Sequence, residues 1–161
     1  MFQKKINLIG VLLFIALMIY SCIDDDICDK ATTPRLTLVL DSLGSKYKKK
    51  QLYIDRKNTD GTVREEGIFS GKDSIQIPLN AMSKETVYYL YDSANTSESD
   101  KNIITIRYET EQRFVSKACG FKVIYNNITY EGTQLINIKS ITPQTTSIHD
   151  ESSTNLHIAY Y

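Results

Sequence analysis

The sequence predicts an all-β fold, an antiparallel β-sandwich of immunoglobulin-like type that follows a cleaved N-terminal signal helix. Three observations carry this prediction. Beyond Cys28, apolar residues alternate with a period of two, turn residues separate the alternating runs at short intervals, and no stretch of helical periodicity follows the signal. A small closed β-barrel is the alternative, because it has the same sequence pattern.

The N-terminal segment has the pattern of a secretory signal. Lys4 and Lys5 form a charged region, and an apolar run from Ile6 to Tyr20 follows. As a helix this run would span roughly 22 Å, which is shorter than the ~30 Å hydrocarbon core of a bilayer. The segment therefore predicts a signal sequence in preference to a transmembrane helix.

The apolar run ends at Ile19-Tyr20-Ser21-Cys22, which resembles a bacterial lipobox. The resemblance implies that Cys22 is diacylated and becomes the first residue of the mature chain. Tyr20 departs from the commonest lipobox pattern, and a plain signal peptide with an unrelated cysteine is the alternative. We expect a signal peptide at 1–21, a lipidated acidic linker at 22–27 and a single β-sandwich domain at 28–161.

The chain has three cysteines, which in an exported protein leaves an odd thiol. If Cys22 carries the lipid, Cys28 and Cys119 remain, and an oxidising compartment would allow them to pair. Two separately buried free cysteines are the alternative.

The first expected strands surround an Asp-Gly turn. Pro34 prevents a helix from continuing into 35–40, where three leucines share one face. A second alternating run lies at 51–56. Asp60-Gly61 then suits a hairpin loop, so we expect a third, weaker strand at 62–69.

The remaining expected strands are less uniform. At 75–79, Pro78 indicates an edge strand because it lacks a ladder donor. Both faces of 86–92 are apolar, which indicates a strand covered on both sides. Later strands are expected at 102–115, 119–125, 134–141 and 155–161, with a turn at Asn126-Asn127. In the strand at 119–125, Cys119, Phe121, Val123 and Tyr125 share one face, and if that face is core the thiol of Cys119 points inward.

Two clusters resemble a family of small bacteroidete lipoproteins of unknown function. The first is Cys22-x-x-x-Asp26-x-Cys28 followed by Ala31-Thr32-Thr33-Pro34, and the second is Lys117-Ala118-Cys119-Gly120-Phe121. The resemblance implies the lipid anchor and the pairing of Cys28 with Cys119. It implies no activity, because none is assigned to that family.

Further resemblances concern the location and modification of the chain. Asp24, Asp25 and Asp26 resemble the acidic export signal of surface lipoproteins in the same bacteria, and an ordinary solvated linker is the alternative. We therefore expect an outer-membrane lipoprotein exposed at the cell surface, with the periplasmic face as the alternative. Asp41-Ser42-Leu43 and Asp92-Ser93-Ala94 resemble O-glycosylation sites, which makes Ser42 and Ser93 candidates, whereas the similar Ser74 lies in an expected strand.

Residues suited to catalysis are few. His149 lies in a polar loop, and His157 lies in the last strand, where a general base has no other support. Serine elbows, paired Cys-x-x-Cys motifs and phosphate-binding glycine loops are missing from the sequence. Asp24 to Asp26 lack the wrapped arrangement that calcium prefers. We expect no enzymatic activity, cofactor or metal.

Charge and aromatic residues suggest what the chain could bind. The 19 basic and 19 acidic side chains balance, so no strong field favours nucleic acid. Lys46, Lys48, Lys49 and Lys50 surround Tyr47 and indicate a solvated loop, with contact to anionic lipid or glycan as the alternative. Eleven tyrosines suggest a glycan platform, for which Tyr53, Tyr88, Tyr130 and Tyr161 are outward candidates. Amphipathic strand tyrosines are the alternative.

Together these features predict a non-catalytic binding or scaffolding module held close to the outer membrane by its lipid. The expected partner is an envelope protein. A surface glycan-binding accessory module, with Tyr53 and Tyr88 as contacts, is the alternative function.

Overall fold

The computed structural model describes Cys28, residues 33–42 and residues 44–161. The predicted signal peptide at 1–21 and lipidated linker at 22–27 lie outside these residues. The described part contains ten strands and one 3-10 helix, η1. Their bounds are β1 (Leu36–Ser42), β2 (Ser45–Lys46), β3 (Leu52–Lys57), β4 (Val63–Phe69), β5 (Ser74–Ile77), β6 (Glu85–Tyr91), η1 (Glu98–Asp100), β7 (Asn102–Ser116), β8 (Gly120–Gln134), β9 (Ile138–Pro143) and β10 (Leu156–Tyr160).

The chain divides into two units. The first joins residues 1–30 with 115–120, and the second joins residues 31–114 with 121–161. All side chains of the hydrophobic core come from the second unit. The packed core is therefore a property of the second unit, whereas Cys28 and Cys119 belong to the first.

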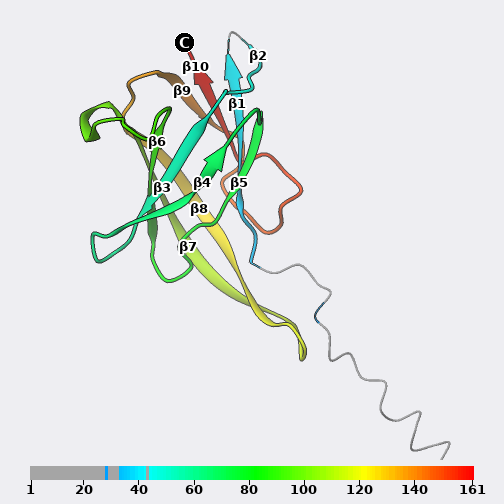
Figure 1. Ribbon diagram of the computed structural model, residues 1–161. Coiled ribbons are helices and arrows are strands. Elements are labelled where there is room, and N and C mark those ends of the chain that lie inside the picture. Colours follow the sequence, from blue (N-terminus) through cyan, green and yellow to red (C-terminus); the bar gives the residue numbers. More distant parts are fainter. Residues whose placement is uncertain (1–27, 29–32, 43) are drawn as a thin grey trace, which may run out of the picture. The chain divides into compact units, whose positions relative to one another are not determined.

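The strands form two sheets whose inner faces share one core (Figure 1). One sheet has the order β2-β1-β10-β9, with β5 also paired to β1, and the other has the order β4-β3-β6-β7-β8. This arrangement confirms the predicted all-β sandwich. The closed-barrel alternative is wrong, because the strands within 33–42 and 44–161 form two sheets rather than one continuous ring.

Strands β1 and β10 run in parallel, with Leu38 opposite Leu156 and Ser42 opposite Tyr160. The prediction of purely antiparallel sheets is therefore wrong at this pair. Parallel neighbours cannot be joined by a tight turn. Here the chain from the end of β1 at Ser42 to the start of β10 at Leu156, which contains all the other strands, connects them. Pairing the first strand with the last ties both ends of the second unit into one sheet.

The core is built from the inward rows of both sheets, as the period of two predicted. Leu36, Leu38 and Leu40 of β1 are buried, and so are Leu156 and Ile158 of β10. Burying a leucine or isoleucine side chain contributes about 1.5 to 3 kcal/mol. The other sheet supplies the facing row of Leu52, Ile54, Tyr88, Leu90, Ile104 and Ile106.

One predicted turn is confirmed and another is wrong. Gly61 has a φ of 85° in the β3–β4 hairpin, where the amide of Asn58 donates to the carbonyl of Thr62 at 2.8 Å. No turn occurs at Asn126-Asn127, because β8 runs through both residues. Asn127 has a φ of 51° inside the strand, a left-handed conformation that asparagine tolerates better than most residues.

Candidate functional site

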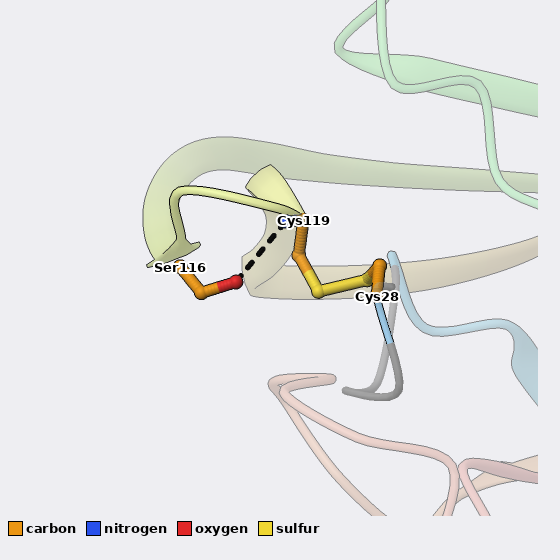
Figure 2. Close-up of a disulfide and its surroundings, with 3 residues drawn as sticks. All are labelled: Cys28, Ser116 and Cys119. Atoms are coloured by element: carbon orange, nitrogen blue, oxygen red, sulfur yellow. Dashed lines mark hydrogen bonds between the residues drawn. A yellow bond between two sulfur atoms is a disulfide. The ribbon is translucent and has the colours of Figure 1, made fainter. Parts of the chain in front are cut away.

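A disulfide joins Cys28 to Cys119, with their Cα atoms 4.8 Å apart (Figure 2). The amide of Cys119 also donates to Ser116 Oγ at 3.0 Å, which closes the turn between β7 and β8. The implied pairing is confirmed, and the alternative of two free cysteines is wrong. The chain that precedes residue 28 is therefore covalently attached to the β7–β8 connection.

Cys22 and the acidic residues Asp24, Asp25 and Asp26 lie outside the described residues. Lipidation, surface export and the location of the protein remain predictions. Among the residues that the structure describes, no helix is long and apolar enough to cross a membrane.

Tyr88 does not face outward, and its predicted glycan contact is wrong. Its side chain is only 1% exposed, because Thr86, Tyr88 and Leu90 form the face of β6 that packs on the other sheet. The Tyr88 hydroxyl donates to the carbonyl of Pro78. Burial raises the pKa of Tyr88 well above its ordinary value.

Tyr88 is one of three tyrosines that hold the segment after β5. Tyr108 of β7 donates its hydroxyl to the carbonyl of Asn80 at 2.8 Å. Tyr125 of β8 donates to the carbonyl of Leu79 at 3.4 Å. Three neighbouring strands thus bind three consecutive carbonyls, those of residues 78, 79 and 80. These hydroxyls are structural, because each is used inside the protein.

Thr86 completes a closed ring of hydrogen bonds at this segment. The amide of Asn80 donates to Thr86 Oγ1 at 2.9 Å. Tyr108 uses its only proton on the Asn80 carbonyl, so the Thr86 hydroxyl donates to the Tyr108 oxygen, 2.5 Å away. Buried polar groups that are fully paired in this way fix one arrangement of the core.

Tyr53 is half-buried, and its ring stacks on Tyr91 with centroids 5.2 Å apart. One face of the Tyr53 ring is therefore occupied. The hydroxyl of Tyr91 donates to Asp55 at 2.8 Å, and the Lys101 ammonium lies 4.6 Å from the Tyr91 ring centroid. This group accounts for Tyr53 as a packing residue, so it is a weaker glycan candidate than the sequence indicates.

The arrangement best suited to a ligand is a cavity of about 210 Å³ lined by Tyr47, Lys49, Lys50, Gln51 and Asp92. We call it the Lys49 cavity. It lies between the segment that follows β2 and the end of β6. The solvated-loop prediction holds for Lys48 and Lys50, which are exposed. Lys46 is also exposed but lies in β2, and the prediction is wrong for Lys49, which is 6% exposed.

Lys49 is held by a carboxylate and an aromatic ring. Its ammonium contacts Asp92 and lies 4.0 Å from the ring centroid of Tyr160, a cation–π contact. Burial lowers the pKa of Lys49, and the hydrogen bond and charge of Asp92 oppose that shift. Burial also raises the pKa of Tyr160. The ion pair is thus part of the wall of the cavity.

Two asparagines fix the position of Asp92. Asn137 Nδ2 donates to Asp92 Oδ2 at 2.8 Å, and Asn102 Nδ2 donates to Asn137 Oδ1 at 2.7 Å. Asn102 is itself buried and accepts the amide of Ile136 at 2.8 Å. Asp92 therefore has a set orientation, although its side chain is half exposed. No local sequence signal indicates this network, because its members come from three separate segments.

The two histidines have different surroundings. His157 Nδ1 lies 2.5 Å from Asp41 Oδ2 on β1, which makes a histidine–carboxylate pair at the surface of the first sheet. His149 Nε2 lies 3.1 Å from Asn126 Oδ1 and is exposed. No described contact places a serine, threonine or cysteine side chain on His157.

The serine candidates differ in accessibility. Ser93 is exposed just beyond β6, as expected. Ser42 is half-buried at the end of β1, where it pairs with Ser45 and Tyr160. Ser74 lies in β5, as expected, but it is exposed because it faces away from the core. Within the described part of the chain, no group of three or more histidine, cysteine or acidic side chains is placed to hold a metal ion.

The fold and the stapled hairpin define a small disulfide-bonded β-sandwich protein. A model of the family of unknown function DUF6452 matches residues 51–160, which include nine of the described elements from β3 to β10. The chain belongs to this family. Comparison with curated proteins and with solved structures finds no match.

Proposed function

We propose that this protein is a lipid-anchored envelope protein whose sandwich acts as a non-catalytic binding or scaffolding module close to the outer membrane. The supporting observation is the disulfide between Cys28 and Cys119. The segment from a lipidated Cys22 to Cys28 reaches at most roughly 20 Å when fully extended. A partner of this module is therefore expected near the membrane surface.

Labelling with a fatty acid tests the anchor. The Cys22→Ala precursor should lose the acyl label, whereas Cys28→Ala should keep it, because only Cys22 follows the lipobox pattern. Continued labelling of the Cys22→Ala protein would refute the anchor. Protease added to whole cells then tests the leaflet, since a surface form is cut and a periplasmic form is protected.

Cross-linking in intact cells tests the binding role. A short cross-linker should join the anchored protein to a distinct envelope protein, and the Cys28→Ser/Cys119→Ser variant should change that pattern because its domain is no longer stapled. If the anchored wild-type protein gives only its uncross-linked form across a range of cross-linkers, the scaffolding role is wrong.

A second candidate function is glycan binding, which the Lys49 cavity favours. Its lining residues include one aromatic residue, Tyr47, together with the polar or charged residues Lys50, Gln51 and Asp92. An aromatic face together with polar groups in fixed positions suits a ligand that is apolar on one side and rich in hydroxyls. Tyr47 thus replaces Tyr88 as the tyrosine on which this alternative rests.

Binding to immobilised glycans tests this second candidate. Tyr47→Ala should weaken binding, whereas Tyr161→Ala, at a position that is 80% exposed and outside the cavity lining, should not. The absence of binding across a broad panel of glycans, or equal binding by both variants, would refute it.

A further inference from the structure

Two phenylalanines that touch each other are exposed to solvent. Phe114 of β7 is 60% exposed and Phe121 of β8 is 66% exposed. Their ring centroids are 5.5 Å apart, with the rings tilted by 69°. Single exposed apolar residues are common. Two large rings in contact form a continuous apolar surface, and such surfaces are typical of protein–protein or membrane contact sites. We call them the phenylalanine pair.

The outward direction of Phe121 contradicts the alternation that the sequence predicts. The period of two places Phe121 on the same face as Tyr125, yet Phe121 is exposed while Ile124 and Tyr125 are both fully buried. The fold therefore does not use this ring for its own core.

Three cationic residues flank the phenylalanine pair in the sequence. Residues 112–122 contain Arg113, Lys117 and Lys122 and no acidic residue. The Arg113 guanidinium pairs with Glu111 at 3.0 Å, and the Lys122 ammonium donates to the carbonyl of His149 at 3.0 Å. Lys117 is exposed. Aromatic rings next to lysine and arginine are typical of segments that lie at a membrane–water interface.

The covalent path from the anchor rejoins the chain two residues before Phe121 in the sequence. Cys119 is bonded to Cys28 and precedes Phe121 by two positions in the sequence. The chain from Cys22 to Cys28 spans at most roughly 20 Å, and the two steps from Cys119 to Phe121 add about 7 Å. A lipid at Cys22 would keep Phe121 within reach of the leaflet, which favours a lipid surface over a distant protein partner.

We infer that Phe114 and Phe121 enter the headgroup region of the leaflet that holds the lipid anchor. This inference rests on the proposed lipid anchor. It gives the sandwich a second attachment to the membrane, and two attachments would fix how the domain is oriented toward its partners, whereas a single flexible lipid would not.

Tryptophan fluorescence tests this inference directly, because the chain contains no tryptophan. Phe114→Trp and Phe121→Trp each introduce a single fluorophore into the full-length, lipidated protein. Met82→Trp is the matched control, because Met82 is 95% exposed in the segment between β5 and β6. The proteins are reconstituted into vesicles of phosphatidylethanolamine and phosphatidylglycerol, with and without bromine on the acyl chains.

The expected result is a blue shift and a loss of emission in brominated vesicles at positions 114 and 121, with neither change at position 82. If the protein floats with the vesicles but positions 114 and 121 are not quenched, the inference is wrong and the anchor stands. A blue shift without quenching would mean that protein, such as a second copy of this chain, covers the pair, and it would also overturn the inference. Failure to float with vesicles would overturn the anchor and the inference together.

Discussion

The hydroxyl of Tyr108 donates a hydrogen bond to the carbonyl of Asn80, 2.8 Å away. The amide of Asn80 donates to the Thr86 hydroxyl, which in turn donates to the Tyr108 oxygen and closes the ring. This ring, with Tyr88 and Tyr125 on either side of it, fixes the path of the chain between β5 and β6. Its members come from β6 and β7 in one sheet, and the segment they hold leaves an edge strand of the other sheet. The hydrogen bonds of the ring therefore link β6 and β7 to the segment that follows β5, and so connect the two sheets.

Replacing Tyr108 by phenylalanine should destabilise the protein. The change removes one hydroxyl and leaves the Asn80 carbonyl without its partner, which costs about 1 to 3 kcal/mol when the acceptor stays buried. Equilibrium unfolding in urea measures this difference. Tyr161→Phe is the control, because Tyr161 is 80% exposed. Equal stability of the two variants would show that the ring contributes nothing.

Removing the disulfide should lower stability and free the N-terminal segment. For a sequence separation of 91 residues, the chain-entropy model gives an upper value of roughly 4.6 kcal/mol, and about 2 to 4 kcal/mol is typical. Urea unfolding of Cys28→Ser/Cys119→Ser against the oxidised wild type measures the loss. Two reactive thiols in the non-reduced wild-type protein would contradict the disulfide between Cys28 and Cys119.

Stability should fall at alkaline pH because of buried tyrosines. Burial raises the pKa of Tyr130 to about 12, and it also raises the pKa values of Tyr88, Tyr125 and Tyr160. In the unfolded chain these groups lose their protons near pH 10. The folded state then holds more protons, so this stabilisation is complete below pH ~10 and is lost as the pH rises above it.

A pH titration of the phenolate absorbance, followed together with circular dichroism, checks this expectation. The buried tyrosines should ionise only as the β-sheet signal disappears. If all phenolate absorbance develops near pH 10 while the sheet signal is unchanged, the buried tyrosines are accessible and the packing described here is wrong.

The Lys49–Asp92 pair should respond asymmetrically to substitution. Asp92→Ala leaves the ammonium of Lys49 buried without its counterion, and since Asp92 is half exposed we expect a loss of about 1 to 2 kcal/mol. Lys49→Met removes the buried charge and keeps most of the volume, so it should be neutral or stabilising. Lys50→Ala, at an exposed position, is the control. Thermal unfolding of the three variants checks this order, and a larger loss in Lys49→Met than in Asp92→Ala would contradict it.

Local alternation predicted most of the fold, because half-buried strands leave a direct mark on the sequence. The alternating leucines of β1 are one example. The turn at Asp60-Gly61 was predicted from its turn residues. Alternation did not decide which face of β6 is buried, since both faces carry apolar residues and a tyrosine such as Tyr88 can lie on a buried face or on an exposed one. It also could not show that β1 pairs in parallel with β10, because that contact joins opposite ends of the domain.

The candidate site was less accessible to sequence reasoning. Lys49 lies in a run of lysines, and its burial depends on Asp92, Asn137 and Tyr160, which come from distant segments. Phe121 follows the alternation of a core residue until the path of β8 turns it outward. In both cases the information lies in contacts between separate strands and leaves no periodic signal in the chain.

The anchor is the central claim, and the mass of the mature protein purified from membranes tests it most directly. We expect a chain that begins at Cys22, carries a diacylglyceryl group on that residue, and contains an oxidised Cys28–Cys119 pair. A mature chain that begins elsewhere, or an unmodified Cys22, would contradict it.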